Sequence, residues 1–242
     1  MNNTDIPEQI ARENESVRTA GLLKMQAESI EQTGSFVTRG EKHRFFVLNI
    51  IGQIEGHFLS PAQTKTTKYE HVLPLLAALE ENTGIDGLLV LINTIGGDVE
   101  AGLAISEMIA SLSKPTVSLV LGGSHSIGVP LSVSCDKTLI VPSATMTLHP
   151  VRTSGLVVGA PQSFAYFNKM QTRIVDFVCA HSRVDENTLR SYIMRTDDIA
   201  TDMGTVIDGK EALEIGLVDG IGGLKDAYRE LKKLVDINLS KV

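Results

Sequence analysis

A serine in a glycine-bounded turn is the strongest sign of chemistry in this sequence of 242 residues. Ser126 lies in the segment GGSHSIG (122–128), directly after a predicted strand at 116–121. Such a turn can hold a serine hydroxyl at the edge of a sheet, where the next backbone N–H can stabilise an oxyanion. The segment differs from the G-x-S-x-G turn of the α/β-hydrolases. Taken alone, it would suit a helix-capping serine equally well.

A second glycine-rich turn, INTIGGD at 92–98, follows another predicted strand. Paired glycines let backbone amides approach a ligand, and N–H groups at the start of a helix suit an anion or a developing oxyanion. A tight connection between a strand and a helix would also use two glycines, and on this dipeptide alone it is the better explanation.

The general base that a catalytic serine requires could come from any of six histidines, because imidazole titrates near neutral pH. His149 follows the short apolar run at 146–148, at the end of a predicted strand beside the serine turn. His125 adjoins Ser126 in sequence, but we expect it to face another way on so tight a turn. The remaining four lie in polar sequence and are expected to be exposed: His43, His57, His71 and His181.

The elements that must position these residues alternate between strand and helix. Apolar runs bounded by glycine or proline predict extended segments at 35–38, 45–51, 87–92, 116–121, 137–141 and 145–148. Helical spacing of apolar residues predicts helices at 69–80, 99–112, 128–133, 162–181, 186–194, 209–216 and 224–235. This alternation indicates an α/β domain with a largely parallel sheet.

The first part of the chain differs from the rest. Residues 1–42 are rich in polar side chains, and their apolar residues form no strong stripe, which predicts an N-terminal arm that is mobile or depends on a partner. Residues 43–242 are expected to form the folded domain.

Composition excludes several other classes of protein. The net charge is −7, and no basic cluster exists beyond Lys232-Lys233, so nucleic-acid binding is not expected. The two cysteines, Cys135 and Cys179, suit neither a disulfide framework nor a metal site. We therefore predict a reduced, cytoplasmic protein without metal or cofactor. No run reaches the roughly 20 apolar residues of a membrane span, and residues 1–30 lack the apolar stretch of a secretory signal.

Taken in order, the motifs resemble those of the Clp protease proteolytic subunit family. They are Asn93-Thr94-Ile95-Gly96-Gly97, Gly122-x-x-x-Ser126-x-Gly128 and Met146-x-Leu148-His149-Pro150. The separation of Gly97 from Ser126 also matches that family, and the segment GKEALEIGLVD (209–219) resembles its late signature. The resemblance extends over residues 45–223.

This resemblance implies a ClpP-like, or crotonase-like, fold of repeated β-α units with a protruding handle helix at 162–181. It implies Ser126 as the nucleophile and His149 as the general base, with the N–H groups of Gly97 and Ile127 forming the oxyanion hole. Rings of subunits would stack through the handle helix. An isolated subunit is expected to leave the apolar face of that helix in water, including Phe164, Phe167 and Phe177.

The acid of the triad is harder to place. The family's acid lies in an Asp-x-x-x-Asp stretch, which residues 198–202 reproduce, so the resemblance implies Asp198, with Asp197 and Asp202 as rivals. Two residues are added between this stretch and Glu211 relative to the family pattern. Further departures are Ile95 in place of a proline and Ser124-His125 in place of two alanines.

The favoured function is a serine endopeptidase that hydrolyses small or unfolded peptides inside a ring-shaped homo-oligomer. The peptide would add as a strand along Gly155–Gly159. A Clp ATPase partner is not assumed, because the arm does not resemble the usual axial loop. Two alternatives stay open: a catalytically silent ring subunit or scaffold, and a crotonase-type acyl-CoA enzyme of the same fold. Ser126 with His149 argues against the second, since acyl-CoA chemistry more often places carboxylates there.

Overall fold

The computed structural model describes residues 30, 34–152, 159–196 and 204–240. Within these residues a sheet is formed by nine strands: β1 (Ser35–Arg39), β2 (Arg44–Glu55), β3 (Thr66–Lys68), β4 (Gly87–Gly97), β5 (Thr116–His125), β6 (Lys137–Ile140), β7 (Thr145–Leu148), β8 (Thr205–Asp208) and β9 (Gly220–Ile221). The helices are α2 (Tyr69–Glu81), α3 (Val99–Ala110), α4 (Gly128–Val133), α5 (Ala160–Ala180), α6 (Glu186–Ile193), α7 (Gly209–Glu214) and α8 (Leu224–Leu239).

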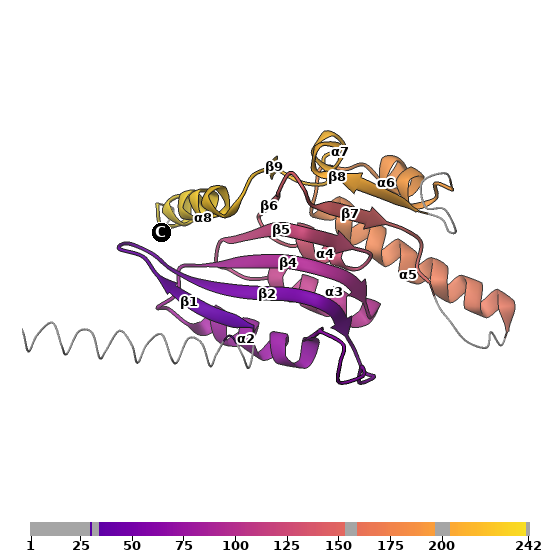
Figure 1. Cartoon of the computed structure of the whole chain (residues 1–242), viewed down its shortest axis with the longest axis horizontal. Helices are drawn as coiled ribbons and strands as arrows, with labels where there is room; N and C mark the ends of the chain where they lie inside the picture. The colour runs from indigo at the N-terminus through magenta and orange to yellow at the C-terminus, as the bar shows by residue number, and fades with distance from the viewer. Residues whose placement is uncertain (1–29, 31–33, 153–158, 197–203, 241–242) are drawn as a thin grey trace, which may run out of the picture.

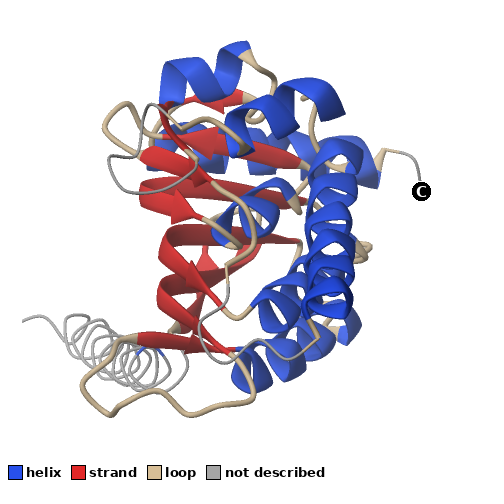
Figure 2. Cartoon of the chain, turned by 90° about the vertical axis from the view of Figure 1, so that its right-hand side faces the viewer, coloured by secondary structure: helices blue, strands red, loops and turns tan. Residues whose placement is uncertain are grey.

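The sheet has a parallel centre with antiparallel additions. Strands run in the order β1-β2-β4-β5-β6-β9, and all neighbours in that series are parallel except β1 with β2. Near its end β5 also pairs in parallel with β7, which pairs antiparallel with β8. Most helices lie along one face of the sheet (Figure 2), and α8 packs on the other face against Phe45, Leu89 and Leu119. The ClpP-like α/β fold predicted from the sequence is confirmed.

The strands reach further than the apolar runs predicted. Both glycine-rich turns turn out to be the ends of strands, since β4 extends to Gly97 and β5 to His125. β2 continues past Gly52, where a positive φ of 80° and a register shift against β4 let the strand pass the glycine. β3, β8 and β9 were not predicted, because such short segments carry too few residues to show alternation.

The handle helix α5 is divided into two halves. Its C-terminal half is packed into the core, where Val175 is 0% and Phe177 6% exposed. Its N-terminal half projects beyond the sheet (Figure 1), with Phe164 74% and Tyr166 55% exposed. The expectation that the whole apolar face would lie in water is therefore wrong for Phe177, which packs within its own chain.

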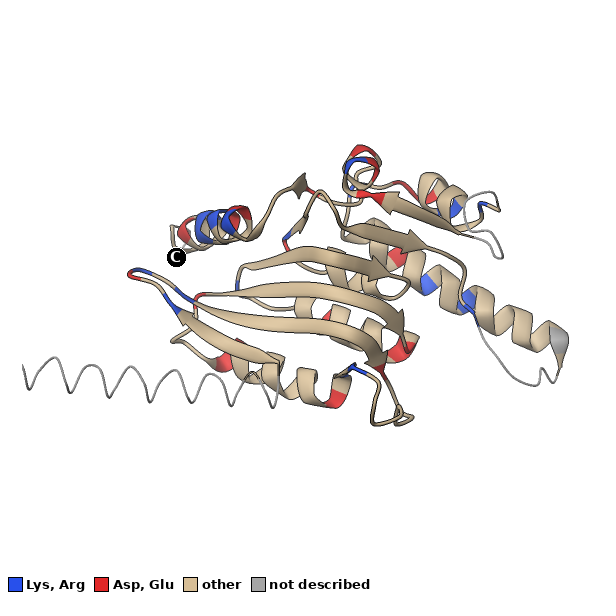
Figure 3. Ribbon diagram, viewed as in Figure 1, with Lys and Arg blue, Asp and Glu red and all other residues tan. Residues whose placement is uncertain are grey.

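Charged side chains are mixed in sign along α8 (Figure 3). Lys233 pairs with Glu230 at 2.9 Å, and Arg229 pairs with Asp226 at 2.8 Å, so the Lys232-Lys233 pair lies on a helix of balanced charge. Among the described residues, none of the helices combines the length and apolar character needed to span a bilayer.

Candidate active site

Ser126 adopts a strained backbone conformation between β5 and α4. Its φ of 58° is the only positive value at a non-glycine position among the described residues. This left-handed conformation costs an L-residue roughly 1–3 kcal/mol, and such strain concentrates at functional sites. The turn is fixed from two sides, because the Ser126 N–H donates to Thr147 O at 2.9 Å and Val129 N–H donates to Ser126 O at 3.0 Å.

The end of β4 lies directly against this serine. A Cβ on Gly96, whose φ is 87°, would be 2.7 Å from Ser126 Cβ and 3.3 Å from Ser126 Oγ. A Cβ on Gly128 would be 2.6 Å from Thr94 Cγ2. Only glycine fits at either position, which explains why both motifs contain it.

Buried hydroxyl groups hold the two strand ends in place. Ser124 Oγ and Ser132 Oγ are 2.7 Å apart, and Ser132 Oγ also donates to Gly128 O at 3.1 Å. On β4, Thr94 Oγ1 donates to Gly52 O at 2.6 Å and accepts from Gly96 N–H at 3.1 Å. A buried hydroxyl without a partner would be costly, so these bonds fix the local geometry.

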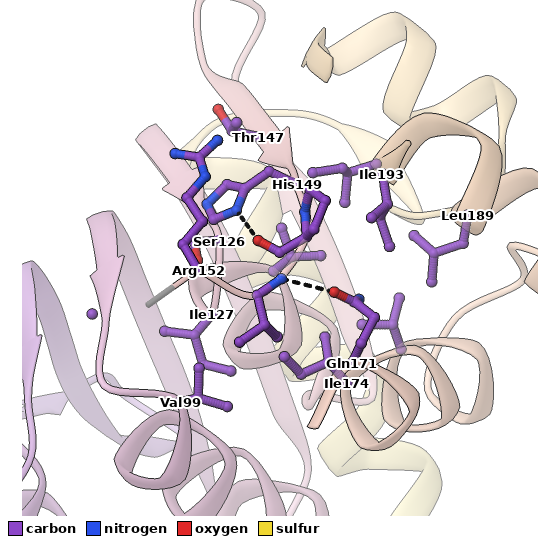
Figure 4. A pocket seen from close by; sticks show the side chains of 16 residues that line it. Val99, Ser126, Ile127, Thr147, His149, Arg152, Gln171, Ile174, Leu189 and Ile193 are labelled. Atoms are coloured by element: carbon purple, nitrogen blue, oxygen red, sulfur yellow. Dashed lines mark hydrogen bonds between the residues drawn. The ribbon is translucent and has the colours of Figure 1, made fainter. Parts of the chain in front are cut away.

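His149 follows β7 and lines the same pocket as Ser126 (Figure 4). Its Nδ1 lies 2.7 Å from Pro150 O. A carbonyl oxygen only accepts hydrogen bonds, so Nδ1 carries the proton in this contact. In neutral imidazole Nε2 then holds the lone pair, which is the form that a general base needs.

His125 belongs to the sheet rather than to the pocket. Its Nδ1 is 2.7 Å from Thr147 Oγ1, and its Nε2 would be 2.3 Å from a Cβ on Gly123. Burial, and next the charge of His149, lower the pKa of His125. The expectation that this histidine faces another way than Ser126 is confirmed, since it does not line the pocket.

The pocket has a volume of about 140 Å³ and an apolar wall. That wall is contributed by α3, α4, α5 and α6 through Val99, Val129, Ile174, Val178, Leu189 and Ile193. Gly97 and Ile127, whose N–H groups are the predicted oxyanion donors, also line it. Arg152 carries the only full charge among the described lining residues, and none of these is Asp or Glu.

Several predicted positions fall outside the described residues. They are the acid Asp198 with its rivals Asp197 and Asp202, most of the peptide-binding segment Gly155–Gly159, and most of the predicted arm at 1–42. Where the chain resumes, Gly204 N–H donates to Arg195 O at 2.7 Å. A Cβ on Gly204 would be 2.7 Å from His149 Cβ, so the chain returns directly beside the predicted base.

The comparison with family models decides the family. The model described as Clp protease matches residues 46–225, which is most of the chain. The protein belongs to the Clp protease family. The resemblance drawn from its motifs is thereby confirmed, and membership of this family supports a peptidase of the serine type.

Two similar proteins illustrate the match. The chain is 49% identical over 210 residues to the translocation-enhancing protein TepA of Halalkalibacterium halodurans, covering 86% of this chain and 82% of that protein. It is 26% identical over 170 residues to the ATP-dependent Clp protease proteolytic subunit 1 of Chlamydia trachomatis, covering 68% and 84%.

Sequence reasoning missed three residues that contact the candidate active site. Thr147 binds Ser126 through its carbonyl and His125 through its hydroxyl, and Gln171 accepts from Val151 N–H at 2.8 Å. Gly204 packs on His149. Thr147 could have been found from its place in the strand before His149, whereas the sequence gives no signal for the other two.

Proposed function

We propose that this protein is a serine endopeptidase in which Ser126 is the nucleophile and His149 the general base. One observation carries the proposal: the strained serine and a histidine with a protonated Nδ1 line one pocket. Nε2 of that histidine is then the atom that would take the serine proton. Asp198 stays a prediction as the acid of the triad.

The chemistry follows from these roles. Ser126 Oγ attacks the scissile carbonyl carbon while its proton moves to His149 Nε2. The carbonyl oxygen becomes an oxyanion that accepts hydrogen bonds from the N–H groups of Gly97 and Ile127. Collapse breaks the C–N bond, and the leaving amine receives the proton from Nε2. Water, deprotonated by His149, then hydrolyses the acyl-enzyme and restores Ser126.

The pocket supports a preference for apolar side chains next to the cleaved bond. A volume of about 140 Å³ with aliphatic walls suits a leucine- or methionine-sized group. Small or unfolded peptides are the proposed substrates, because an extended chain is needed to reach a serine at the end of a strand.

Assembly into stacked rings is part of the proposal. Phe164 and Tyr166 on the projecting half of α5 are largely exposed, and large apolar side chains left in water on a projecting element favour an interface. The proposed location is the cytoplasm, and a Clp ATPase partner is left open. Light scattering is expected to give a large homo-oligomer, and a stable monomer at micromolar concentration would refute the ring.

A fluorophosphonate probe tests the chemistry. The purified full-length protein is incubated with the probe, and the labelled residue is mapped by mass spectrometry. Labelling of Ser126 that disappears in the Ser126→Ala variant is the expected result. If the folded protein takes up no probe and cleaves no peptide, the chain is a catalytically silent ring subunit instead.

A further inference from the structure

His125 is the last residue of β5, and its side chain points away from the pocket. Ser124, one residue earlier, points toward α4, where its hydroxyl lies 2.7 Å from Ser132 Oγ. Side chains alternate along a strand, so the imidazole of His125 lies on the opposite face of the sheet. The proposed mechanism gives this half-buried imidazole no task, although it adjoins the nucleophile.

One residue of β7 binds both His125 and Ser126. Thr147 Oγ1 lies 2.7 Å from His125 Nδ1, and Thr147 O accepts a hydrogen bond from Ser126 N–H at 2.9 Å. The first contact is made by side chains on the face of the sheet, and the second by the backbone. Thr147 therefore holds the end of β5 at two separate points.

We propose that His125 is a positioning residue for Ser126. Its imidazole ties the end of β5 to Thr147 and thereby holds the serine in the conformation that attacks the substrate. The inference rests on the proposed function, in which Ser126 is the nucleophile. His125 does not line the pocket, so it acts through the backbone and Thr147 and not on the substrate.

The first argument concerns the strain at Ser126. A left-handed conformation, here with a φ of 58°, persists only where the surrounding structure holds it in place. β7 pairs with β5 over only three residues, and Thr147 with His125 is the last of these pairs. The end of so short a ladder opens readily. A side-chain bond across the last pair therefore adds restraint directly beside the strained residue.

The second argument concerns the space that the ring occupies. Gly123 lies two residues before His125, on the same face of β5. A Cβ on Gly123 would be 2.3 Å from His125 Nε2, and the next two atoms, at 2.9 and 3.0 Å, belong to the same ring. The imidazole thus lies over a residue without a side chain. Its orientation is fixed between Gly123 on one side and Thr147 on the other.

The third argument concerns the hydrogen bond itself. A hydroxyl group can donate or accept, so the contact between Thr147 and His125 forms with either tautomer of a neutral ring. Burial, and next the charge of His149, lower the pKa of His125, which favours the neutral ring. The tie between β5 and β7 therefore does not depend on which ring nitrogen carries the proton.

Substitution of His125 tests the inference in the full-length protein. His125→Ala removes the tie, whereas His125→Asn retains a polar atom as many bonds from Cα as Nδ1 is. We expect labelling by a small fluorophosphonate to slow roughly tenfold in His125→Ala and to stay near the wild-type rate in His125→Asn. For peptide hydrolysis, kcat should fall while KM stays unchanged. The matched control is His71→Ala, at an exposed position of α2.

A substitution of Gly123 displaces the ring without removing it. Gly123→Ala should slow labelling about as much as His125→Ala does, because the added methyl group would overlap the imidazole. In a protein that already carries His125→Ala, the same change should cause no further decrease. If the two effects add instead, Gly123→Ala acts by another route, and the position of the ring does not control Ser126.

A third measurement reports on the nucleophile without any chemistry. Hydrogen exchange of the Ser126 amide, followed in protein labelled with ¹⁵N-serine, measures how often its bond to Thr147 O opens. We expect exchange to quicken roughly tenfold in His125→Ala and to stay near the wild-type rate in His125→Asn. Thermal unfolding checks that each variant is folded at the temperature of the assay.

The two proposals fail in different ways. If the wild type takes up no probe, the peptidase proposal falls, while amide exchange still decides whether His125 holds Ser126 in place. If the wild type is labelled at Ser126 but His125→Ala behaves like His71→Ala in both labelling and exchange, the peptidase proposal stands and the positioning role of His125 is wrong.

Discussion

The two halves of the pocket are held by different kinds of structure. Ser126 is fixed by its immediate surroundings, the ends of β4, β5 and β7 and the start of α4, through backbone bonds and buried hydroxyl groups. His149 lies beyond the end of β7 and is held by its own peptide, which a side chain of α5 secures in turn. The serine half is therefore set by the centre of the sheet, and the histidine half by elements that arrive later in the chain.

The largest effect is expected on the serine half. Ser126→Ala should reduce peptide hydrolysis and probe labelling by about 10⁴-fold or more, because the proposed nucleophile is lost. His149→Ala should lose comparably, since nucleophile and base act as a unit. Both are measured by labelling rate, with thermal unfolding as the check on folding. Labelling that moves to Ser124, which is fully buried, would contradict the assignment.

A large effect is also expected from the glycine that lies against the serine. Gly96→Ala places a Cβ 2.7 Å from Ser126 Cβ and 2.8 Å from His125 O, at a φ of 87°. Displacement of the nucleophile should lower kcat/KM by about 10²-fold. Gly223→Ala is the control, because a Cβ there has no atom within 4 Å. Equal activity of the two variants would show that the serine half tolerates displacement.

The acid of the triad is tested by three matched variants. If Asp198 holds that role, Asp198→Asn should lower turnover by about 10⁴-fold. Asp197→Asn and Asp202→Asn should stay within about tenfold, or 1.4 kcal/mol in barrier. A collapse of activity in one of these two would move the assignment to that residue, and near-wild-type activity of all three variants would reject an acid in this stretch.

The buried hydroxyl network should affect stability more than activity. Ser132→Ala leaves the buried Ser124 hydroxyl without its 2.7 Å partner. The expected cost is about 1–3 kcal/mol in the free energy of unfolding, measured by chemical denaturation. Ser111→Ala on the exposed end of α3 is the control. An unchanged unfolding midpoint in Ser132→Ala would mean that the network does not hold the serine half together.

The smallest effect concerns pH. Burial, and next the charge of His149, lower the pKa of His125 in the folded chain below its ordinary value near 6.5. The folded state therefore binds this proton less readily than the unfolded state does. The resulting stability is complete above that ordinary value and is lost as pH falls through the folded pKa. His125→Gln should show a smaller decrease in Tm between neutral and mildly acidic pH than the wild type, and an equal decrease would contradict this.

The serine half was also the part that sequence could predict. α4 and β7 have the bounds that their apolar runs and flanking residues indicate. Paired glycines marked the approach of Gly96 to Ser126, although both glycine-rich turns proved to be strand ends. These features depend on residues close together in the chain, so their pattern is visible without the fold.

The histidine half depends on contacts that no local pattern records. Gln171 is one of many polar residues in α5, and nothing in the sequence distinguishes it from the others. Its hydrogen-bond partner, Val151, becomes known only once α5 is placed against the rest of the chain. His43 was expected to be exposed because its neighbours are polar, yet it is buried beside Asp86 and Asp236 from distant segments and stacks on Phe45. That expectation is wrong for the same reason, since its partners come from other parts of the chain.

The pairing of β7 with β8 has a consequence for the order in which the protein forms. Thr147, whose carbonyl holds Ser126, lies in a strand that pairs with residues 205–208. A chain emerging from the ribosome can complete β5 and α4 long before those partners exist, and contacts so distant in sequence form late. β7 can pair with β5 as soon as residues 145–148 are made, but its other edge stays open until β8 is synthesised. The strand that accepts the Ser126 hydrogen bond and leads into His149 is therefore paired on both of its edges only near the end of synthesis.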